Sequence, residues 1–352
     1  MPALQPPSYL FYEPVFGSQS VEVFISTRFE VEFEQEPVVL VDIGASGGLQ
    51  PHWKPAQRHL KVIGFEPDKR EFGRLAASAP PWIRYFNTAL ADKPGPVLFH
   101  LLRKQMTSSI FEPNLPLLRR FPDVDDFTQV ETVSVEADTL DRVLGAAEVT
   151  DVDFIKIDTQ GAELSILRGG VGLLDATVFG MELEVEFLPI YKGQPLFAEV
   201  DEYARSKGYE LFDLRPFRWK KAIGQDLGGP NGQIAFADAL YFKSLEGLAA
   251  ILAALPDRES RRRKTLRCIA ICILYGYLDY ALELFETHTE LFDKADKEAF
   301  QGELKHSRRR MNRFPDFRGR WRTADAFYRL SQVLDPTNAG WSIGGRRLGN
   351  RE

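Results

Sequence analysis

The sequence predicts an α/β protein: a doubly wound, mostly parallel, seven-stranded Rossmann-like sheet with an antiparallel closing hairpin, plus a C-terminal helical appendage. Two motifs carry this prediction, VDIGASGG at 41–48 and FIKIDTQGAE at 154–163. In each, an apolar stretch runs directly into a glycine-containing turn, as a buried parallel strand does before its helix. A third observation is that strand-like and helix-like segments alternate through the first 240 residues.

Seven segments have the pattern of core strands: 38–43, 61–65, 83–86, 154–157, 178–185, 210–214 and 234–242. Two further strand-like segments, 97–102 and 132–135, indicate an insertion or crossover after the third core strand. A glycine-rich link joins the last two core strands, which suits an antiparallel hairpin. Helical spacing is clearest at 68–79 and at 196–207, where Gly208 is a typical C-terminal stop.

We expect three regions. A proline- and aromatic-rich lead-in covers 1–36, the α/β domain covers 37–244, and a basic helical domain covers 245–352. In the last region, apolar residues recur at helical spacing between Leu266 and Ala281, and more helices are expected at 290–311 and 321–334.

The charge of the chain is unevenly distributed. The formal net charge is −6, but residues 251–352 carry 20 Lys and Arg against 14 Asp and Glu, so that the first 250 residues carry −12. The basic region is either a solvated helical surface or a face that docks an anionic partner or supports oligomerisation. An acidic body argues against binding of nucleic acid.

The chain has only two cysteines, Cys268 and Cys272, spaced i and i+4 in an apolar helical stretch. They have the pattern of buried free thiols, which indicates a reducing compartment, and we expect a cytoplasmic protein. The N-terminus shows no leader pattern, and no apolar run is long enough to span a bilayer.

The first motif indicates a cofactor site. The strand ends in Asp42, and the turn after it allows close backbone approach and ligand-facing N–H groups; it contains Gly44, Ala45, Ser46 and Gly47. The spacing is not that of the dinucleotide fingerprint G-x-G-x-x-G.

The ends of the next two strands extend this site. Glu66, followed by Pro67, lies where a carboxylate can accept the hydroxyls of a ribose. Asn87, Thr88 and Ala89 end the third strand, where they would lie near an adenine; an ordinary turn is an equally good interpretation.

Four motifs occur in the order found in FkbM-like S-adenosylmethionine-dependent methyltransferases, and the chain resembles this family over about residues 37–215. They are VDIGA at 41–45, GFEP at 64–67, DTLD at 138–141 and IKIDTQGAE at 155–163. The resemblance implies a class I methyltransferase fold, S-adenosylmethionine as cofactor, Gly44 near its methionine end and Glu66 at its ribose. It also implies methylation of hydroxyls on sugars or polyketide-like products. Many members have Glu where this chain has Gln160, and the helical region lies outside the resemblance.

A hydroxyl acceptor must lose a proton, which calls for a general base. Asp158, at the tip of the fourth core strand, is the first candidate; contact with the cofactor or helix capping is the alternative. Glu182, Glu184 and Glu186 share one face of the fifth strand, and Glu184 is the candidate second base or metal ligand. A divalent metal is possible there, but no ligand spacing predicts one.

Two further residues are candidates from their position alone. His52 follows the first motif closely and could reach the crevice as a catalytic group; a packing histidine is the alternative. Ser109 could bind the cofactor carboxylate, or could belong to an ordinary strand-end turn.

The leading hypothesis is an O-methyltransferase acting on a hydroxyl of a glycan, a sugar or a secondary metabolite. Two alternatives remain open at this point. One is a methyltransferase-like binding protein without catalysis, and the other is a nicotinamide-dependent oxidoreductase, which the glycine spacing does not favour.

Overall fold

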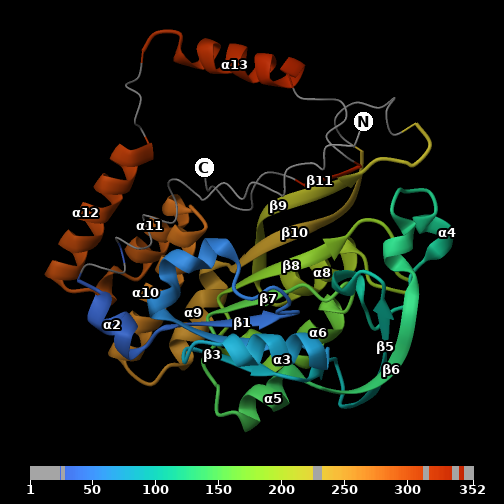
Figure 1. Ribbon diagram of the computed structural model, residues 1–352. Helices are drawn as coiled ribbons and strands as arrows, with labels where there is room; N and C mark the ends of the chain where they lie inside the picture. Colours follow the sequence, from blue (N-terminus) through green and yellow to red (C-terminus); the bar gives the residue numbers. More distant parts are fainter. Residues whose placement is uncertain (1–23, 25–27, 225–231, 312–316, 335–340, 345–352) are drawn as a thin grey trace.

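The computed structural model describes residues 24, 28–224, 232–311, 317–334 and 341–344. Most of the expected lead-in at 1–36 and most of the glycine-rich hairpin link lie outside these residues. Within them, the predicted fold class is confirmed (Figure 1).

A central sheet has the order β11-β9-β10-β8-β7-β1-β2-β3. Its strands are β1 (Val38–Ile43), β2 (Leu60–Phe65), β3 (Ile83–Phe86), β7 (Phe154–Ile157), β8 (Gly180–Glu186), β9 (Tyr209–Trp219), β10 (Gln233–Lys243) and β11 (Ser342–Gly344). Neighbouring strands in the series β8, β7, β1, β2 and β3 pair in parallel. Strand β10 is antiparallel to both of its neighbours, β8 and β9. The seven predicted strands are therefore present, and β11 adds a short eighth strand beside β9.

The predicted insertion forms a small second sheet of order β4-β6-β5. It consists of β4 (Ala89–Leu90), β5 (Gly95–Leu102) and β6 (Gln129–Asp138), with η2 (Gln105–Thr107), α4 (Leu115–Leu118) and η3 (Val124–Phe127) between β5 and β6.

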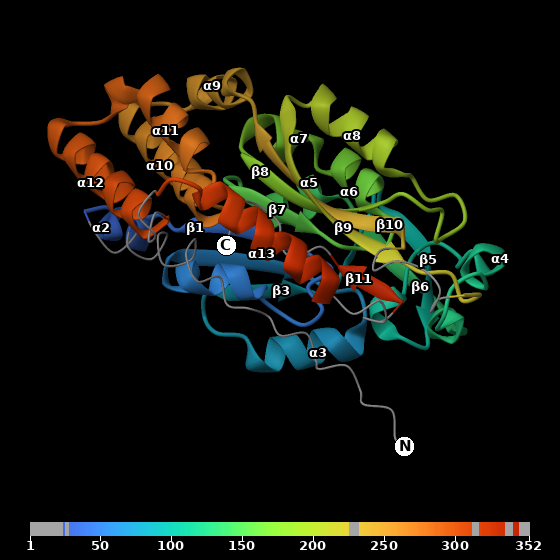
Figure 2. The same ribbon diagram turned by 90° about the horizontal axis from the view of Figure 1, so that it is seen from above.

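Helices lie on both sides of the central sheet, as a doubly wound fold requires (Figure 2). The α/β part contains α2 (Glu30–Gln35), η1 (Pro51–His59), α3 (Lys69–Ser78), α5 (Leu140–Ala146), α6 (Glu163–Gly169), α7 (Val171–Ala176) and α8 (Phe197–Ser206). The C-terminal part contains α9 (Leu245–Ala254), α10 (Arg258–Leu274), α11 (Leu278–Thr287), η4 (Thr289–Leu291), α12 (Lys294–Met311) and α13 (Arg320–Leu334).

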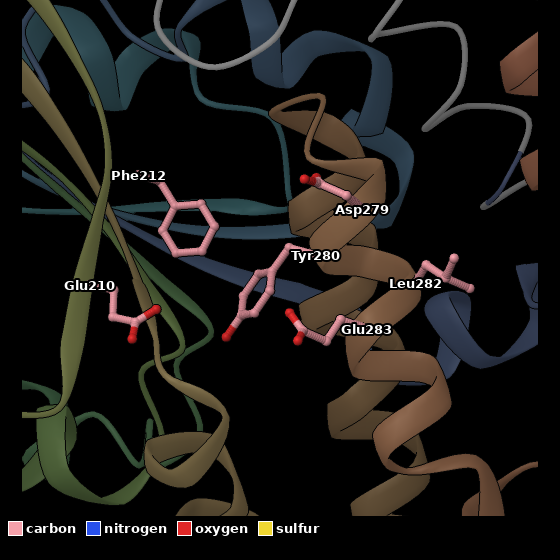
Figure 3. A pocket seen from close by; sticks show the side chains of 6 residues that line it. All are labelled: Glu210, Phe212, Asp279, Tyr280, Leu282 and Glu283. Carbon is pink, nitrogen blue, oxygen red and sulfur yellow. The ribbon is translucent and has the colours of Figure 1, made fainter.

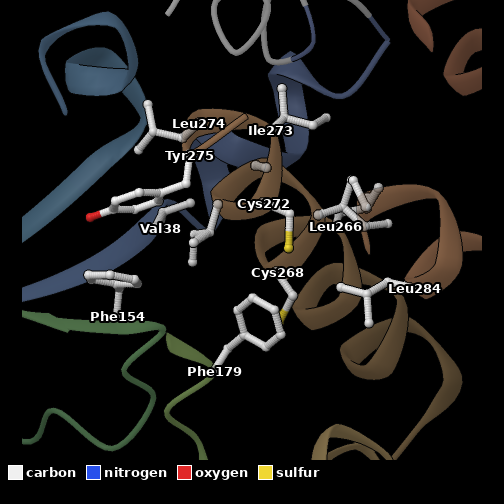
Figure 4. Close-up of a cluster of buried hydrophobic side chains, with 14 of the residues drawn as sticks. Val38, Phe154, Phe179, Leu266, Cys268, Cys272, Ile273, Leu274, Tyr275 and Leu284 are labelled. Atoms are coloured by element: carbon white, nitrogen blue, oxygen red, sulfur yellow. The ribbon is translucent and has the colours of Figure 1, made fainter. Parts of the chain in front are cut away.

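Alternation along the strands divides the core between the two faces of the sheet. Val41 and Ile43 of β1 pack in one apolar cluster, together with residues of α5 to α8. Val38 and Leu40 of the same strand pack in another cluster, which also contains residues of α9, α10 and α11. The C-terminal helices thus share an apolar core with the sheet (Figure 4).

Buried ion pairs fix α10 against the amino end of β7. Asp153, which is fully buried, lies 2.7 Å from the Lys264 ammonium and 2.9 Å from the Arg267 guanidinium. Its carboxylate also accepts the N–H of Val39, so the pair is joined to β1. Because these charges are paired and hydrogen-bonded, their burial is tolerated.

Candidate active site

The loop after β1 is braced by its own backbone. The N–H groups of Gly44 and Ala45 both donate to the carbonyl of Phe65, at 3.1 Å, and the N–H of Gly47 donates to Glu71. The expectation that these particular groups face a ligand is therefore wrong for the structure as it stands. Gly44 has a φ of +78°, and a Cβ there would lie 2.0 Å from the carbonyl oxygen of Asp158, so that only glycine fits.

The outer part of this loop is open to solvent. Gly47, also at positive φ, has nothing within 4 Å of where its Cβ would be, and Ser46 beside it is exposed. Below it, Asp42 is buried and its Oδ1 makes no hydrogen bond. Burial raises the pKa of this carboxyl, although the nearby Lys156 opposes the shift.

Glu66 ends β2 at the same edge of the sheet. Burial raises its pKa to about 7, and one carboxylate oxygen accepts the N–H of Asp68 at 2.9 Å. The Asn87 amide donates to the carbonyls of Glu66 and Pro67, at 2.8 and 3.0 Å, and so braces the end of β2. Thr88 is half-buried beside them. Ala89 lies further in, buried at the start of β4 in the small sheet.

The face of the sheet that α10 covers is apolar at the amino ends of the parallel strands. Towards their carboxyl ends, the side chains on this face are charged. We call this set the polar row. Asp42, Lys156 and Glu182 are neighbours in register across β1, β7 and β8, and Glu184, Asp238 and Arg215 are neighbours across β8, β10 and β9. Asp158, just beyond β7, completes the row: Asp42, Lys156, Asp158, Glu182, Glu184, Arg215 and Asp238.

Lys156 is the cation at the centre of this row. Its ammonium lies 3.5 Å from Asp42 and 3.4 Å from Asp158, and donates to the carbonyl of Gly44 at 3.3 Å. Burial opposes its charge, but Asp158, Asp42 and Glu182 outweigh burial and raise the pKa of Lys156. The ammonium therefore stays charged and holds the first loop and two carboxylates together.

Gln160 separates two carboxylates that would otherwise repel each other. Its amide nitrogen donates to Asp158 at 3.3 Å and to Glu184, and its amide oxygen accepts from the Tyr191 hydroxyl at 3.0 Å. Burial, followed by the charge of Asp158, raises the pKa of Glu184. A glutamate at 160 would add a third acidic group here, so the departure from the family pattern has a local physical reason.

Two further buried acidic residues near these carboxylates differ in their partners. Glu163 is buried and accepts the N–H groups of Thr159 and Gly161 at 2.9 and 3.3 Å, so it shapes the turn after β7. Glu186 is buried at the end of β8, where its Oε1 has no hydrogen-bond partner and burial raises its pKa.

His52 and Ser109 lie beneath the surface of the site. His52 Nε2 is 3.1 Å from the Tyr275 hydroxyl and 3.7 Å from Glu182. Ser109 is fully buried; its hydroxyl donates to the carbonyl of Gln160 at 2.7 Å and accepts the N–H of Phe111. Ser109 thus supports the turn at Gln160, and both of its hydrogen-bonding roles are used inside the protein.

Four members of this arrangement were not predicted from the sequence: Lys156, Arg215, Asp238 and Tyr275. Lys156 could have been found, because it lies two residues before Asp158 in a strand and so faces the same side. Pairing of Arg215 with Asp238 depends on the hairpin register, which no local pattern gives. Tyr275 lies more than a hundred residues from β7, directly after α10, in a region that the motifs do not include.

A hollow of about 470 Å³ lies elsewhere, between β9 and α11 (Figure 3). It is lined by Glu210, Phe212, Asp279, Tyr280, Leu282 and Glu283. None of these belongs to the loop at Gly44 or to the polar row, so the hollow is not the candidate active site.

In the described part of the chain, no three His, Cys, Asp or Glu side chains are grouped so that they could hold a metal ion. No helix among the described residues combines the length and the apolar character needed to cross a membrane.

Comparison with known proteins gives a match to a family model. Residues 42–211 match the methyltransferase FkbM domain. The chain is 28% identical over 175 residues to the 2-O-methyltransferase NoeI of Sinorhizobium fredii, covering 48% of this chain and 72% of NoeI.

Two solved structures are more distant. A TehB-like SAM-dependent methyltransferase from Corynebacterium glutamicum is 13% identical, with a TM-score of 0.31 over 65% of this chain and 89% of its own. The 1,6-didemethyltoxoflavin-N1-methyltransferase of Burkholderia thailandensis is 11% identical, with a TM-score of 0.29 over 65% and 78%. Likenesses this low carry no argument, and the fold rests on the strand order. Residues 42–211 of this chain are thus similar to the FkbM methyltransferase family.

Proposed function

We propose that the protein is an S-adenosylmethionine-dependent O-methyltransferase whose acceptor is a hydroxyl of a sugar, a glycan or a secondary metabolite. The observation that carries this proposal is the contact between the glycine loop and Asp158. A Cβ on Gly44 would lie 2.0 Å from the Asp158 carbonyl, so the cofactor loop and a part-exposed carboxylate meet at one point. The similarity to a 2-O-methyltransferase supports a hydroxyl as the acceptor.

The residues of the first two strands fit the cofactor. Asp42 lies buried at the end of β1, next to the turn; its Oδ1 makes no hydrogen bond and is 3.5 Å from the Lys156 ammonium, so its carboxylate could also face the positive charge of a ligand. We assign Gly44, Ala45, Ser46 and Gly47 to the methionine end, with Glu66 and Pro67 at the ribose and Asn87, Thr88 and Ala89 near the adenine. When bound, S-adenosylmethionine supplies a methyl group already activated on a sulfonium.

Asp158 is the proposed general base. Its side chain is 39% exposed, and its Oδ2 lies 3.4 Å from the Lys156 ammonium. Asp158 would accept the proton of the acceptor hydroxyl as that oxygen takes the methyl group from the bound cofactor. The Gln160 amide that donates to Asp158 also donates to Glu184, which is the proposed second base.

His52 has a weaker claim as a catalytic group. It is held against Tyr275 and Glu182. A supporting role within the polar row is therefore our proposal for it.

Calorimetric titration of the full chain with S-adenosylmethionine, S-adenosylhomocysteine and, as a control, NADH tests the cofactor. We expect binding of the first two and none of NADH. Glu66→Ala should lose about 1.5–3 kcal/mol of affinity, because a charge-assisted hydrogen bond is removed. Unchanged affinity in that variant would remove Glu66 from the site.

Asp158→Asn tests the base. In a screen of sugar and glycan acceptors with methyl-labelled cofactor, this variant should lose transfer while keeping cofactor affinity. Full transfer by Asp158→Asn would overturn the assignment.

A further inference from the structure

The side chain of Tyr275 links the C-terminal helices to the candidate active site. Tyr275 follows the last turn of α10, and its ring is fully buried. It stacks on Phe154 of β7, with ring centres 5.3 Å apart, and Trp53 meets it edge-on at 6.0 Å. Figure 4 shows its hydroxyl pointing out of the apolar cluster, away from the cysteines.

That hydroxyl enters the polar row. It donates to the Oε2 of Glu182 at 2.7 Å, in a buried hydrogen bond. His52 Nε2 lies 3.1 Å from the same hydroxyl, and Gln50 donates to the other oxygen of Glu182 at 3.4 Å. Hydrogen bonds to a buried carboxylate are among the stronger ones, so Glu182 is held in a defined place.

Glu182 is connected to the cofactor loop through Lys156. It is the β8 neighbour of Lys156 in the register of the sheet. Its charge, with those of Asp158 and Asp42, keeps Lys156 charged against its burial. The Lys156 ammonium then holds the carbonyl of Gly44 at 3.3 Å. A path therefore runs from Tyr275 at the end of α10 to the turn after β1: a hydrogen bond to Glu182, a charge interaction between register neighbours, and a hydrogen bond from Lys156 to Gly44.

We propose that Tyr275, which lies outside the FkbM segment, is a positioning residue for the cofactor loop at Gly44, acting through Glu182 and Lys156. The inference rests on the proposed function, because it takes this loop as part of the S-adenosylmethionine site. It gives the C-terminal helices a part in cofactor binding that the family domain alone does not contain.

The chain offers a matched control for Tyr275→Phe. Tyr277 lies two residues on, and its hydroxyl donates to the carbonyl of Phe212 at 3.1 Å, on the apolar part of the same sheet face. Tyr277→Phe therefore removes one hydroxyl from the same region without touching the polar row. Both variants should lose a few degrees of melting temperature.

The test is calorimetric titration of the full chain with S-adenosylhomocysteine. Tyr275→Phe should weaken binding about tenfold, as expected for a lost hydrogen bond to a charged group, whereas Tyr277→Phe should bind as the wild type does. Glu182→Gln should weaken binding similarly. The double variant should be no worse than Glu182→Gln, because the two residues act through one contact.

The outcomes separate the inference from the proposed function. Suppose that the wild type binds S-adenosylhomocysteine and that the affinity of Tyr275→Phe is within about twofold of the wild-type affinity, or no lower than that of Tyr277→Phe. The inference is then wrong, and the proposed function stands. If the wild type does not bind S-adenosylhomocysteine, the proposed function falls and this inference with it. Should Tyr275→Phe fail to fold, Glu182→Gln alone decides, since normal binding by that variant rules out this path.

A kinetic readout distinguishes positioning from a general loss of stability. With an acceptor from the screen above, Tyr275→Phe should raise the KM for S-adenosylmethionine and leave kcat within about twofold. A fall in kcat at unchanged KM would contradict an effect on the cofactor loop.

Discussion

The two faces of the central sheet use the same strands differently. The face towards α6, α7 and α8 is apolar along the whole length of β1, β7 and β8, from Val41 to Val185. The face towards α10 is apolar only at the amino ends, where Leu40 and Phe154 pack, and carries the polar row at the carboxyl ends. One face therefore serves stability alone, whereas the other divides its length between a core and a candidate active site.

The largest expected effect comes from removing the helices that cover the apolar part of the second face. A chain truncated after Ser244 would expose Leu240 and Phe242, which are fully buried against α9 to α11. We expect it to lack a cooperative thermal transition by circular dichroism. A chain ending after Met311 keeps these helices and should retain the transition. A cooperative transition in the shorter chain would instead make 37–244 an independent domain.

Next in size is the loss of a buried ion pair that fixes α10. Arg267→Ala should lower the free energy of unfolding by about 1.5–3 kcal/mol, because buried Asp153 would lose its charge-assisted hydrogen bonds to Arg267 while Lys264 still pairs with it. Arg263→Ala on the same helix removes pairs with more exposed carboxylates and should cost less than about 1 kcal/mol. Urea unfolding measures both, and equal effects would contradict the distinction.

The titration of Glu66 should make stability depend on pH. Since folding raises its pKa from 4.5 to about 7, its contribution is full below pH 4.5 and is lost as the pH rises through 7. The free energy of unfolding should fall by at most about 3 kcal/mol over this interval on its account. Urea unfolding at pH 5 and pH 8 should show a smaller decrease in Glu66→Gln than in the wild type. An identical decrease would mean that Glu66 is not buried as described.

The smallest effect sharpens the description of the polar row. Gln160→Glu replaces the amide donor between Asp158 and Glu184 by a third carboxylate. We expect a loss of about 1–2 kcal/mol at pH 8 and less at pH 5, where a proton can restore a donor. Gln105→Glu, at an exposed position, should change stability by no more than about 0.5 kcal/mol.

The sequence predicted the parts of the fold that depend on local patterns. We predicted β1, β7 and the turns after them because each strand and its turn are formed by consecutive residues with a recognisable pattern. Asp158 and Glu66 were found for the same reason, since each follows a strand directly. The short β11 was missed, as three residues carry too little pattern to predict pairing.

The rest of the candidate site could not be predicted because it depends on contacts between distant segments. Asp238 meets Arg215 only through the register of β9 and β10, which contains two irregularities. Tyr275 reaches Glu182 across 93 residues, and its own surroundings read as an ordinary apolar helix. The N–H groups of the first turn were assigned to a ligand because the sequence does not reveal that Phe65 accepts two of them.

The packing of α10 also makes the protein convenient to label. Cys268 and Cys272 are the only cysteines of the chain, and both are free and buried. Burial raises the pKa of the Cys268 thiol to about 12, and that of Cys272 is raised as well, so neither forms an appreciable amount of thiolate at neutral pH. A cysteine introduced on the surface, for example at exposed Ser46 beside the cofactor loop, would react selectively with a thiol-directed fluorophore. Loop movements could then be followed optically without first removing the native thiols.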